Sequence, residues 1–171
     1  SAEESAPVST VPDSVALTDR VSAMKLAGET DQIVTVVWQR SSLAQATFFQ
    51  KGSDGSWSET FTTDCYIGKN GVTDKKEEGD SKTPVGAYTF GMAFGRADDP
   101  GSVIPYHKLE KNDYWVDDPE SPFYNQFVTF SGREKPWRSA EHLIEETAAY
   151  RYVLNICCNP GRIPGKGSAV F

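Results

Sequence analysis

The chain has 171 residues, which is enough for about one domain with a sizeable core, and 38% of them are hydrophobic. Its net charge of -7 and its sequence pI near 4.8 argue against a nucleic-acid groove or a polybasic membrane-binding surface. No apolar run approaches the roughly 18 residues that a membrane-spanning helix requires.

The first residues are polar and lack the charged and apolar regions of a signal peptide. We interpret residues 1–12 as a flexible spacer of the kind that follows a removed signal or lipid anchor. An ordinary ragged terminus is the alternative. Residues 13–171 are predicted to form one domain.

Pro12-Asp13-Ser14 is predicted to start a helix, because Val15, Leu17, Val21 and Met24 then form a loose helical apolar stripe that Gly28 can end. The following residues favour an antiparallel meander of three strands, the first of which is β-branched and should be buried. These strands are expected at 33–38, 43–50 and 57–66, with a turn at 51–55.

Residues 77–90 form a charged, glycine-containing loop in front of a strand expected at 87–94. Residues 96–105 have turn chemistry, and residues 113–125 combine prolines, acids and aromatics in an irregular segment. A short strand is predicted at 127–130.

A second helix is predicted after Ser139, a suitable N-cap, because apolar residues then recur at helical spacing. The stripe consists of Ala140, Leu143, Ile144, Thr147 and Ala148.

A strand is expected at 150–159, followed by a basic, glycine-rich loop at 160–167 and the beginning of a further strand at 168–171. Alternation places Tyr152, Leu154, Ile156 and Cys158 on the inward face of strand 150–159. The other face carries Arg151, Val153, Asn155, Cys157 and Asn159. The predicted fold class is therefore mainly β with one or two helices.

Phosphate, dinucleotide and metal motifs are poorly matched. Ser81 stands where a phosphate loop needs glycine before Lys82, and no ribose-binding acid follows Gly165-Lys166-Gly167. Neither histidine, His107 nor His142, has a ligand at metal spacing, and both are expected to be solvent-exposed. No cofactor or metal is predicted.

Three acids lie together at Asp117, Asp118 and Glu120. They could form a glycosidase pair, but beside two prolines we interpret them as turn formers and caps.

The three cysteines are too few for a disulfide framework. Cys158 resembles a small core residue, whereas Cys157 shares a face with Asn155 and Asn159 and is predicted to border a cleft. As a nucleophile Cys157 would need a nearby base. A bond between Cys157 and Cys158 is not expected, because their side chains point in opposite directions; Cys65 with one of the pair is the alternative.

Six blocks of the sequence, in order, resemble the L,D-transpeptidase (YkuD-type) catalytic domain of secreted bacterial cell-wall proteins. They are Tyr66–Gly71, Glu78–Gly86, Tyr114–Pro119, Ser121 with Tyr124-Asn125, Trp137 with Ser139-Ala140-Glu141, and Gly165–Ser168. The resemblance as a whole runs collinearly over about residues 32–171.

The resemblance implies a mixed β-sandwich fold and a location outside the cell or in the cell envelope of a bacterium. It also implies acyl transfer between peptidoglycan stem peptides. A cysteine thiolate attacks the amide after the third stem residue, with a histidine as base and backbone amides as oxyanion donors, and the acyl group passes to an amine or to water. Membrane tethering through a removed signal or lipid anchor fits the N-terminal spacer.

The family's histidine and its Ser/Thr-x-Gly-Cys block would follow Phe171, so the domain is expected to be incomplete at its C-terminus and no catalytic residue is assigned within the chain. This chain alone is predicted to be inactive. Truncation is one explanation and a degenerate, non-catalytic peptidoglycan-binding or scaffold domain on the same fold is the other. Substrate-binding candidates from the matched blocks and the adjoining strand, for which a structural role is the alternative, are Lys82, Thr83, Tyr124, Asn125, Asn159 and Ser168.

Overall fold

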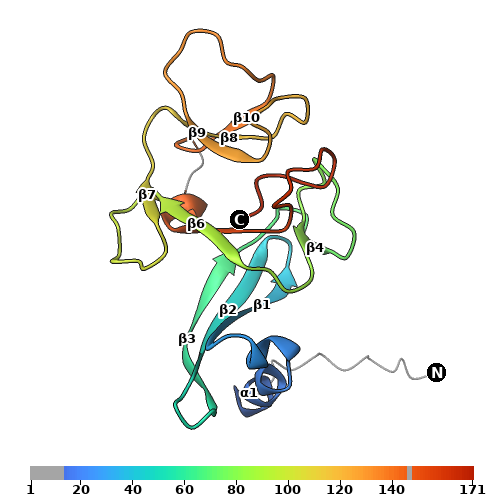
Figure 1. Ribbon diagram of the computed structural model, residues 1–171, viewed down its shortest axis with the longest axis vertical. Helices are drawn as coiled ribbons and strands as arrows, with labels where there is room; N and C mark the ends of the chain where they lie inside the picture. Colours follow the sequence, from blue (N-terminus) through green and yellow to red (C-terminus); the bar gives the residue numbers. More distant parts are fainter. Residues whose placement is uncertain (1–13, 146–147) are drawn as a thin grey trace, which may run out of the picture. The chain divides into compact units, whose positions relative to one another are not determined.

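A computed structural model describes residues 14–145 and 148–171 of the chain (Figure 1). The predicted spacer, residues 1–12, lies outside the described residues. The protein is mainly β, as predicted, with one α-helix and two short 3₁₀-helices among the described residues. It divides into two compact units. One comprises the described residues up to Gln39 with Ala44–Cys65, and the other comprises Arg40–Leu43 with Tyr66–Phe171.

The first unit contains the predicted N-terminal helix and all three predicted strands. Its elements are α1 (Ser14–Ser22), the 3₁₀-helix η1 (Lys25–Gly28), β1 (Gln32–Arg40), β2 (Leu43–Lys51) and β3 (Trp57–Tyr66). The strands form one sheet in the order β1-β2-β3, which confirms the expected meander order.

The prediction that the first strand is buried is wrong for most of its length. Ile33 packs with Val21, Ala27, Phe49 and Trp57 in a small core, but residues 36–40 of β1 are exposed. The helical residues in this core, Val21 and Ala27, pack with Ile33 near the start of β1. Val36, further along the same β-branched run, lies outside this core and is 52% exposed. The β-branched composition of the run therefore predicted its strand conformation without predicting its burial.

The second unit contains three small sheets. Its elements are β4 (Val72–Thr73), β5 (Thr83–Pro84), β6 (Phe90–Gly95), β7 (Tyr106–Lys108), β8 (Asp113–Val116), β9 (Gln126–Thr129), β10 (Ala140–His142), η2 (Ala148–Arg151) and β11 (Val153–Ile156). The sheets have the orders β11-β6-β7, β10-β8-β9 and β4-β5. Strand β6 runs antiparallel to β11 and parallel to β7, whereas β8 is antiparallel to both neighbours.

Phe94 on β6 forms the centre of the larger core in this unit. It is 0% exposed and packs with the buried side chains of Leu109, Trp115, Leu143 and Val153. These residues come from several strands and loops, so this core links the β6 sheet to the β8 sheet. The pocket described below is lined by residues of both sheets.

The predicted helix after Ser139 is wrong in its described part. Residues 140–142 form strand β10, which pairs with β8 through Ala140↔Val116 and His142↔Tyr114. Residues 143–145 form a turn in which Leu143 N donates to Asp113 O (3.1 Å). A short helix gains little by itself, and here the unpaired edge of β8 provides a backbone partner that outweighs the helical apolar spacing. Thr147, the fourth member of the predicted stripe, lies outside the described residues.

Three further parts of the chain differ from the prediction between residues 87 and 125. The strand expected from Ala87 begins only at Phe90, because Tyr88 folds back and its hydroxyl donates to Val85 O (3.2 Å). The segment expected to be irregular, 113–125, opens with the buried strand β8. His107, expected in a loop, is part of β7. The strand predicted at 127–130 is present as β9, displaced by one residue.

The strand predicted at 150–159 is shorter than expected. Its first two residues belong to η2, and β11 ends where Cys158 N donates back to Ile156 O (2.9 Å) in a tight turn. Val153, expected on the outward face, is buried in the core. Ser168–Phe171 has no strand assignment because Ala169 has a φ of 49°, although Val170 O still accepts from Ile156 N (3.1 Å).

Candidate functional site

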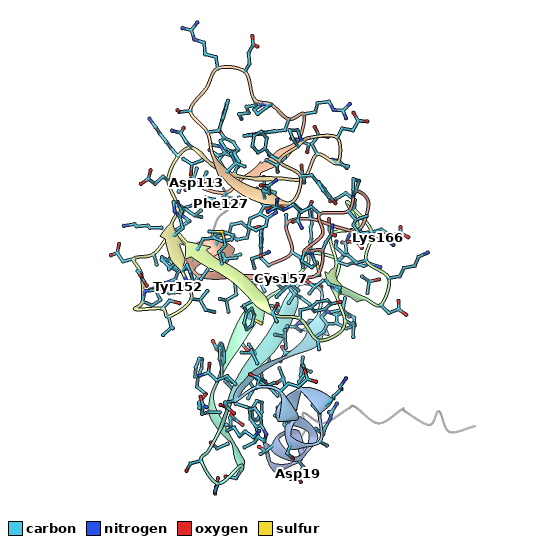
Figure 2. The ribbon with its side chains drawn as sticks, in the orientation of Figure 1. Asp19, Asp113, Phe127, Tyr152, Cys157 and Lys166 are labelled. Atoms are coloured by element: carbon cyan, nitrogen blue, oxygen red, sulfur yellow. The ribbon has the colours of Figure 1, made fainter. Side chains whose placement is uncertain are left out.

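A pocket of about 280 Å³ lies in the second unit, where the β8-β9 edge faces the end of β11. Apolar and polar side chains line it together. They are Met92, Trp115, Asn125, Gln126, Phe127, Asn155, Ile156, Cys157, Asn159, Pro160 and Arg162. Figure 2 labels two of them, Phe127 and Cys157. The predicted face of Asn155, Cys157 and Asn159 therefore borders a concave site, as expected.

Asn125 connects three parts of the pocket wall. Its Oδ1 accepts from Trp115 Nε1 (3.0 Å) and from Ala169 N (3.3 Å), and its Nδ2 donates to Asn159 O (3.1 Å). Its φ of 54° lies in the left-handed region, which asparagine tolerates better than most residues. Asn125 is thus held by β8, the C-terminal segment and the 160–167 loop at once.

Asn159 organises the loop that follows it. It is 5% exposed, donates to Ile163 O and Gly167 O (3.0 Å each), and accepts from Ile163 N (3.0 Å). Because three loop backbone groups bond to one buried amide, the loop holds Arg162 at the pocket without regular secondary structure.

Beside the pocket, the Glu78 carboxylate joins two of the predicted site residues. It accepts hydrogen bonds from the Tyr124 hydroxyl and from Ser168 Oγ (2.9 Å), and Glu78 N donates to Gly165 O (3.2 Å). Figure 1 shows the C-terminal loop in red next to the green segment that carries β4. Tyr124 and Ser168 are both buried. The pKa of Tyr124 lies well above its usual range. Burial is the largest cause, and the hydrogen bond to Glu78 and the negative charge of Glu78 raise the pKa further.

Lys82 and Thr83 do not line the pocket. Thr83 Oγ1 accepts from Gly68 N (2.8 Å), and Thr83 N donates to Gly71 O (2.9 Å), which ties β5 to the loop before β4. Lys82 N donates to Asp80 Oδ1 (2.8 Å). A Cβ on Gly68 would lie 2.7 Å from Lys82 Cα, so these two loops pack backbone against backbone. The contacts of Lys82 and Thr83 are therefore those of a scaffold.

The three cysteines are free thiols and all are half-buried. Cys157 lines the pocket, and Cys157 N donates to Thr89 O (2.9 Å). Burial raises the pKa of the Cys158 thiol, which suits a packed thiol better than a nucleophile.

The two histidines bond to groups other than Cys157. His107 Nε2 lies 2.8 Å from Asp113 Oδ2, and its ring packs against Phe127. His142 bonds to Lys111 O and Glu145 and stacks on Tyr114. Their side chains are 37% and 27% exposed, which makes both histidines more buried than expected.

Asp118 supports the interpretation of the acidic cluster as turn formers. It accepts from Arg138 N (2.8 Å) and Glu120 N (3.0 Å), and these backbone hydrogen bonds lower the pKa of its carboxyl group. The residues that the structure describes contain no group of three His, Cys, Asp or Glu side chains that could hold a metal ion. None of their helices has the length and apolar character to cross a membrane.

Several pocket residues were not predicted from the sequence. The period-2 alternation around Cys157 predicted Asn155, but no local signal marked Met92, Gln126, Phe127 or Arg162. Comparison of the chain with family models, with curated proteins and with solved structures finds no match.

Proposed function

We propose that this chain forms the stem-peptide-binding scaffold of a peptidoglycan L,D-transpeptidase-like domain. The domain would be a mixed β-sandwich and would act outside the cell or in the cell envelope of a bacterium. The proposal begins from the six collinear sequence blocks that resemble that family. It assigns the chain to acyl transfer between stem peptides through a cysteine thioester.

The observation that carries the proposal is that these blocks, far apart in sequence, are in contact within one unit. Tyr124 and Ser168 both bond to Glu78, 46 and 90 residues away respectively. Asn70 N donates to Ser81 O (2.8 Å), which joins the first two blocks.

The remaining blocks join the same set. Ala140 pairs with Val116, and the rings of Tyr114 and Trp137 lie 5.6 Å apart. Trp115 Nε1 donates to Asn125, as described above.

In the proposed reaction, the chain positions the stem peptide and supplies polar groups around it. Asn125 and Asn159 hold the pocket wall, and the Glu78–Tyr124–Ser168 network fixes the C-terminal loop beside it. The nucleophile would be a cysteine thiolate, a role that the resemblance does not assign to Cys65, Cys157 or Cys158. It attacks the carbonyl carbon of the amide after the third stem residue, the C–N bond breaks, and the fourth residue leaves as an amine that takes up a proton. The resulting thioester passes its acyl group to an amine or to water, which releases the cysteine.

The test uses the protein encoded by the complete reading frame, incubated with a carbapenem and analysed by intact-mass and peptide-mapping mass spectrometry. We expect a single adduct on a cysteine other than Cys65, Cys157 and Cys158. The absence of an adduct, or an adduct on one of these three, would contradict the proposal.

The second candidate is a non-catalytic peptidoglycan-binding domain on the same fold. It is favoured by the contacts of the two histidines, which among the described residues bond to groups other than a cysteine. This candidate requires no pair of nucleophile and base. Sedimentation with purified cell-wall sacculi separates the candidates. A scaffold binds sacculi without a carbapenem adduct, whereas the enzyme also forms the adduct.

A further inference from the structure

The pocket beside Cys157 presents one cation and two hydrogen-bond acceptors that have no partner among the described residues. Arg162, an exposed residue of the 160–167 loop, is one of the lining residues. Gln126 donates through Nε2 to Pro122 O (3.0 Å) and Asn155 donates through Nδ2 to Val170 O (3.0 Å). Among the described residues, no donor bonds to the amide oxygen of either side chain.

The rest of the lining is apolar. Met92, Trp115, Phe127, Ile156 and Pro160 supply rings and aliphatic groups. Ligand sites typically combine such a lining with a few convergent polar groups. A volume of about 280 Å³ is at the small end for ligand pockets, which suits a molecule of about one or two amino-acid residues.

Gly91 packs closely against two of the lining residues, Asn155 and Cys157. A Cβ at this position would lie 2.5 Å from Asn155 Oδ1 and 3.3 Å from Cys157 Sγ. Two of the lining residues, Asn125 and Arg162, have φ values of 54° and 52°. Left-handed non-glycine residues are uncommon and occur preferentially at functional sites.

We propose that this pocket binds a small N-acylated amino acid, or the carboxyl end of a short peptide, that carries an apolar side chain. Arg162 pairs with the carboxylate, which a guanidinium binds with charge-assisted hydrogen bonds. Gln126 Oε1 and Asn155 Oδ1 accept from the amide N–H of the ligand. The apolar side chain lies against Phe127 and Met92. The inference rests on the proposed function, because it concerns the pocket whose wall is proposed to position the stem peptide. Binding is measured without the nucleophile, so a failure of binding is distinguishable from a failure of acyl transfer.

The test is calorimetric titration of the protein encoded by the complete reading frame with N-acetyl-L-leucine and with N-acetyl-L-leucinamide. We expect saturable binding of the acid and about tenfold weaker binding of the amide, since the amide lacks the charged group. R162Q should weaken binding of the acid by about tenfold. The matched control is R133Q, which makes the same charge change at an exposed arginine outside the pocket and should leave binding unchanged.

A second readout is the rate at which Cys157 is alkylated by iodoacetamide. N-acetyl-L-leucine should slow alkylation of Cys157 and leave Cys65 unaffected, because only Cys157 lines the pocket. Equal binding of the acid and the amide, equal effects of R162Q and R133Q, or no saturable binding would each overturn the inference.

Discussion

The hydrogen bond between Tyr124 and Glu78 provides a direct test of the network beside the pocket. Tyr124 is 3% exposed, and its hydroxyl donates to a carboxylate that also accepts from Ser168. Tyr124→Phe removes this donor and leaves the ring in place. Hydrogen bonds to charged groups contribute about 1.5–3 kcal/mol, so we expect a loss of about 2 kcal/mol in the free energy of unfolding.

The assay is chemical denaturation at neutral pH, followed by tryptophan fluorescence, because Trp115 and Trp137 are in the same unit as Tyr124. The matched control is Tyr152→Phe at a half-exposed tyrosine, which should change stability by less than about 0.5 kcal/mol. A double-mutant cycle with Glu78→Gln should give a coupling energy of about 1 kcal/mol or more. Additive effects, or a Tyr124→Phe variant as stable as the control, would refute the reasoning.

Tyr124→Phe should also change how the free energy of unfolding depends on pH. The pKa of Tyr124 is raised in the folded protein above the value of about 10 in an unfolded chain. The folded state therefore retains this proton at pH values where the unfolded state loses it. The resulting stabilisation is present below about pH 10 and declines as the pH rises beyond it. We expect Tyr124→Phe to lose less stability than the parent protein between neutral and alkaline pH.

Three further predictions concern packing and charge. Gly95→Ala should lower the free energy of unfolding by about 3 kcal/mol, because the added Cβ would lie 2.2 Å from a backbone carbonyl oxygen of η2. In the control, Gly28→Ala, the added Cβ meets nothing within 4 Å, so the change in stability should be near zero. Leu143→Ala, at a 0% exposed core position, should cost about 3 kcal/mol in the same assay, and Val103→Ala at a fully exposed position should cost about nothing. Backbone N–H donors lower the pKa of Asp118, so the stabilisation from its carboxylate is present above about pH 4 and is lost as the pH falls. Asp118→Asn should therefore make the free energy of unfolding less dependent on pH in the acid range. An unchanged dependence on acid pH would contradict this prediction.

The sequence predicted best those elements whose signals are local. The first unit has β-branched or aromatic runs separated by a glycine-containing turn, and all three of its strands are present. The alternation around Cys157 predicted that Asn155 and Asn159 share a concave site with it, and both line the pocket. A period-2 pattern needs no information about distant residues.

The remaining features depend on tertiary partners that no short window contains. Residues 140–144 have helical spacing, yet residues 140–142 pair with β8 because that strand has an open edge there. The placement of Arg162 depends on a left-handed backbone conformation and on a loop held by the buried Asn159 amide. The hydrogen bond from Tyr124 to Glu78 joins residues 46 positions apart. Both residues lie in blocks that carry the family resemblance, but the sequence did not predict that these blocks are in contact.

The most direct test of the proposed function is conversion of a peptidoglycan fragment. The protein encoded by the complete reading frame would be incubated with a disaccharide tetrapeptide, and the products would be separated and weighed by liquid chromatography and mass spectrometry. The proposal predicts cleavage after the third stem residue, with a tripeptide or a cross-linked dimer as product. A tetrapeptide that remains intact would contradict the proposal, provided that tryptophan fluorescence shows the protein to be folded under the assay conditions.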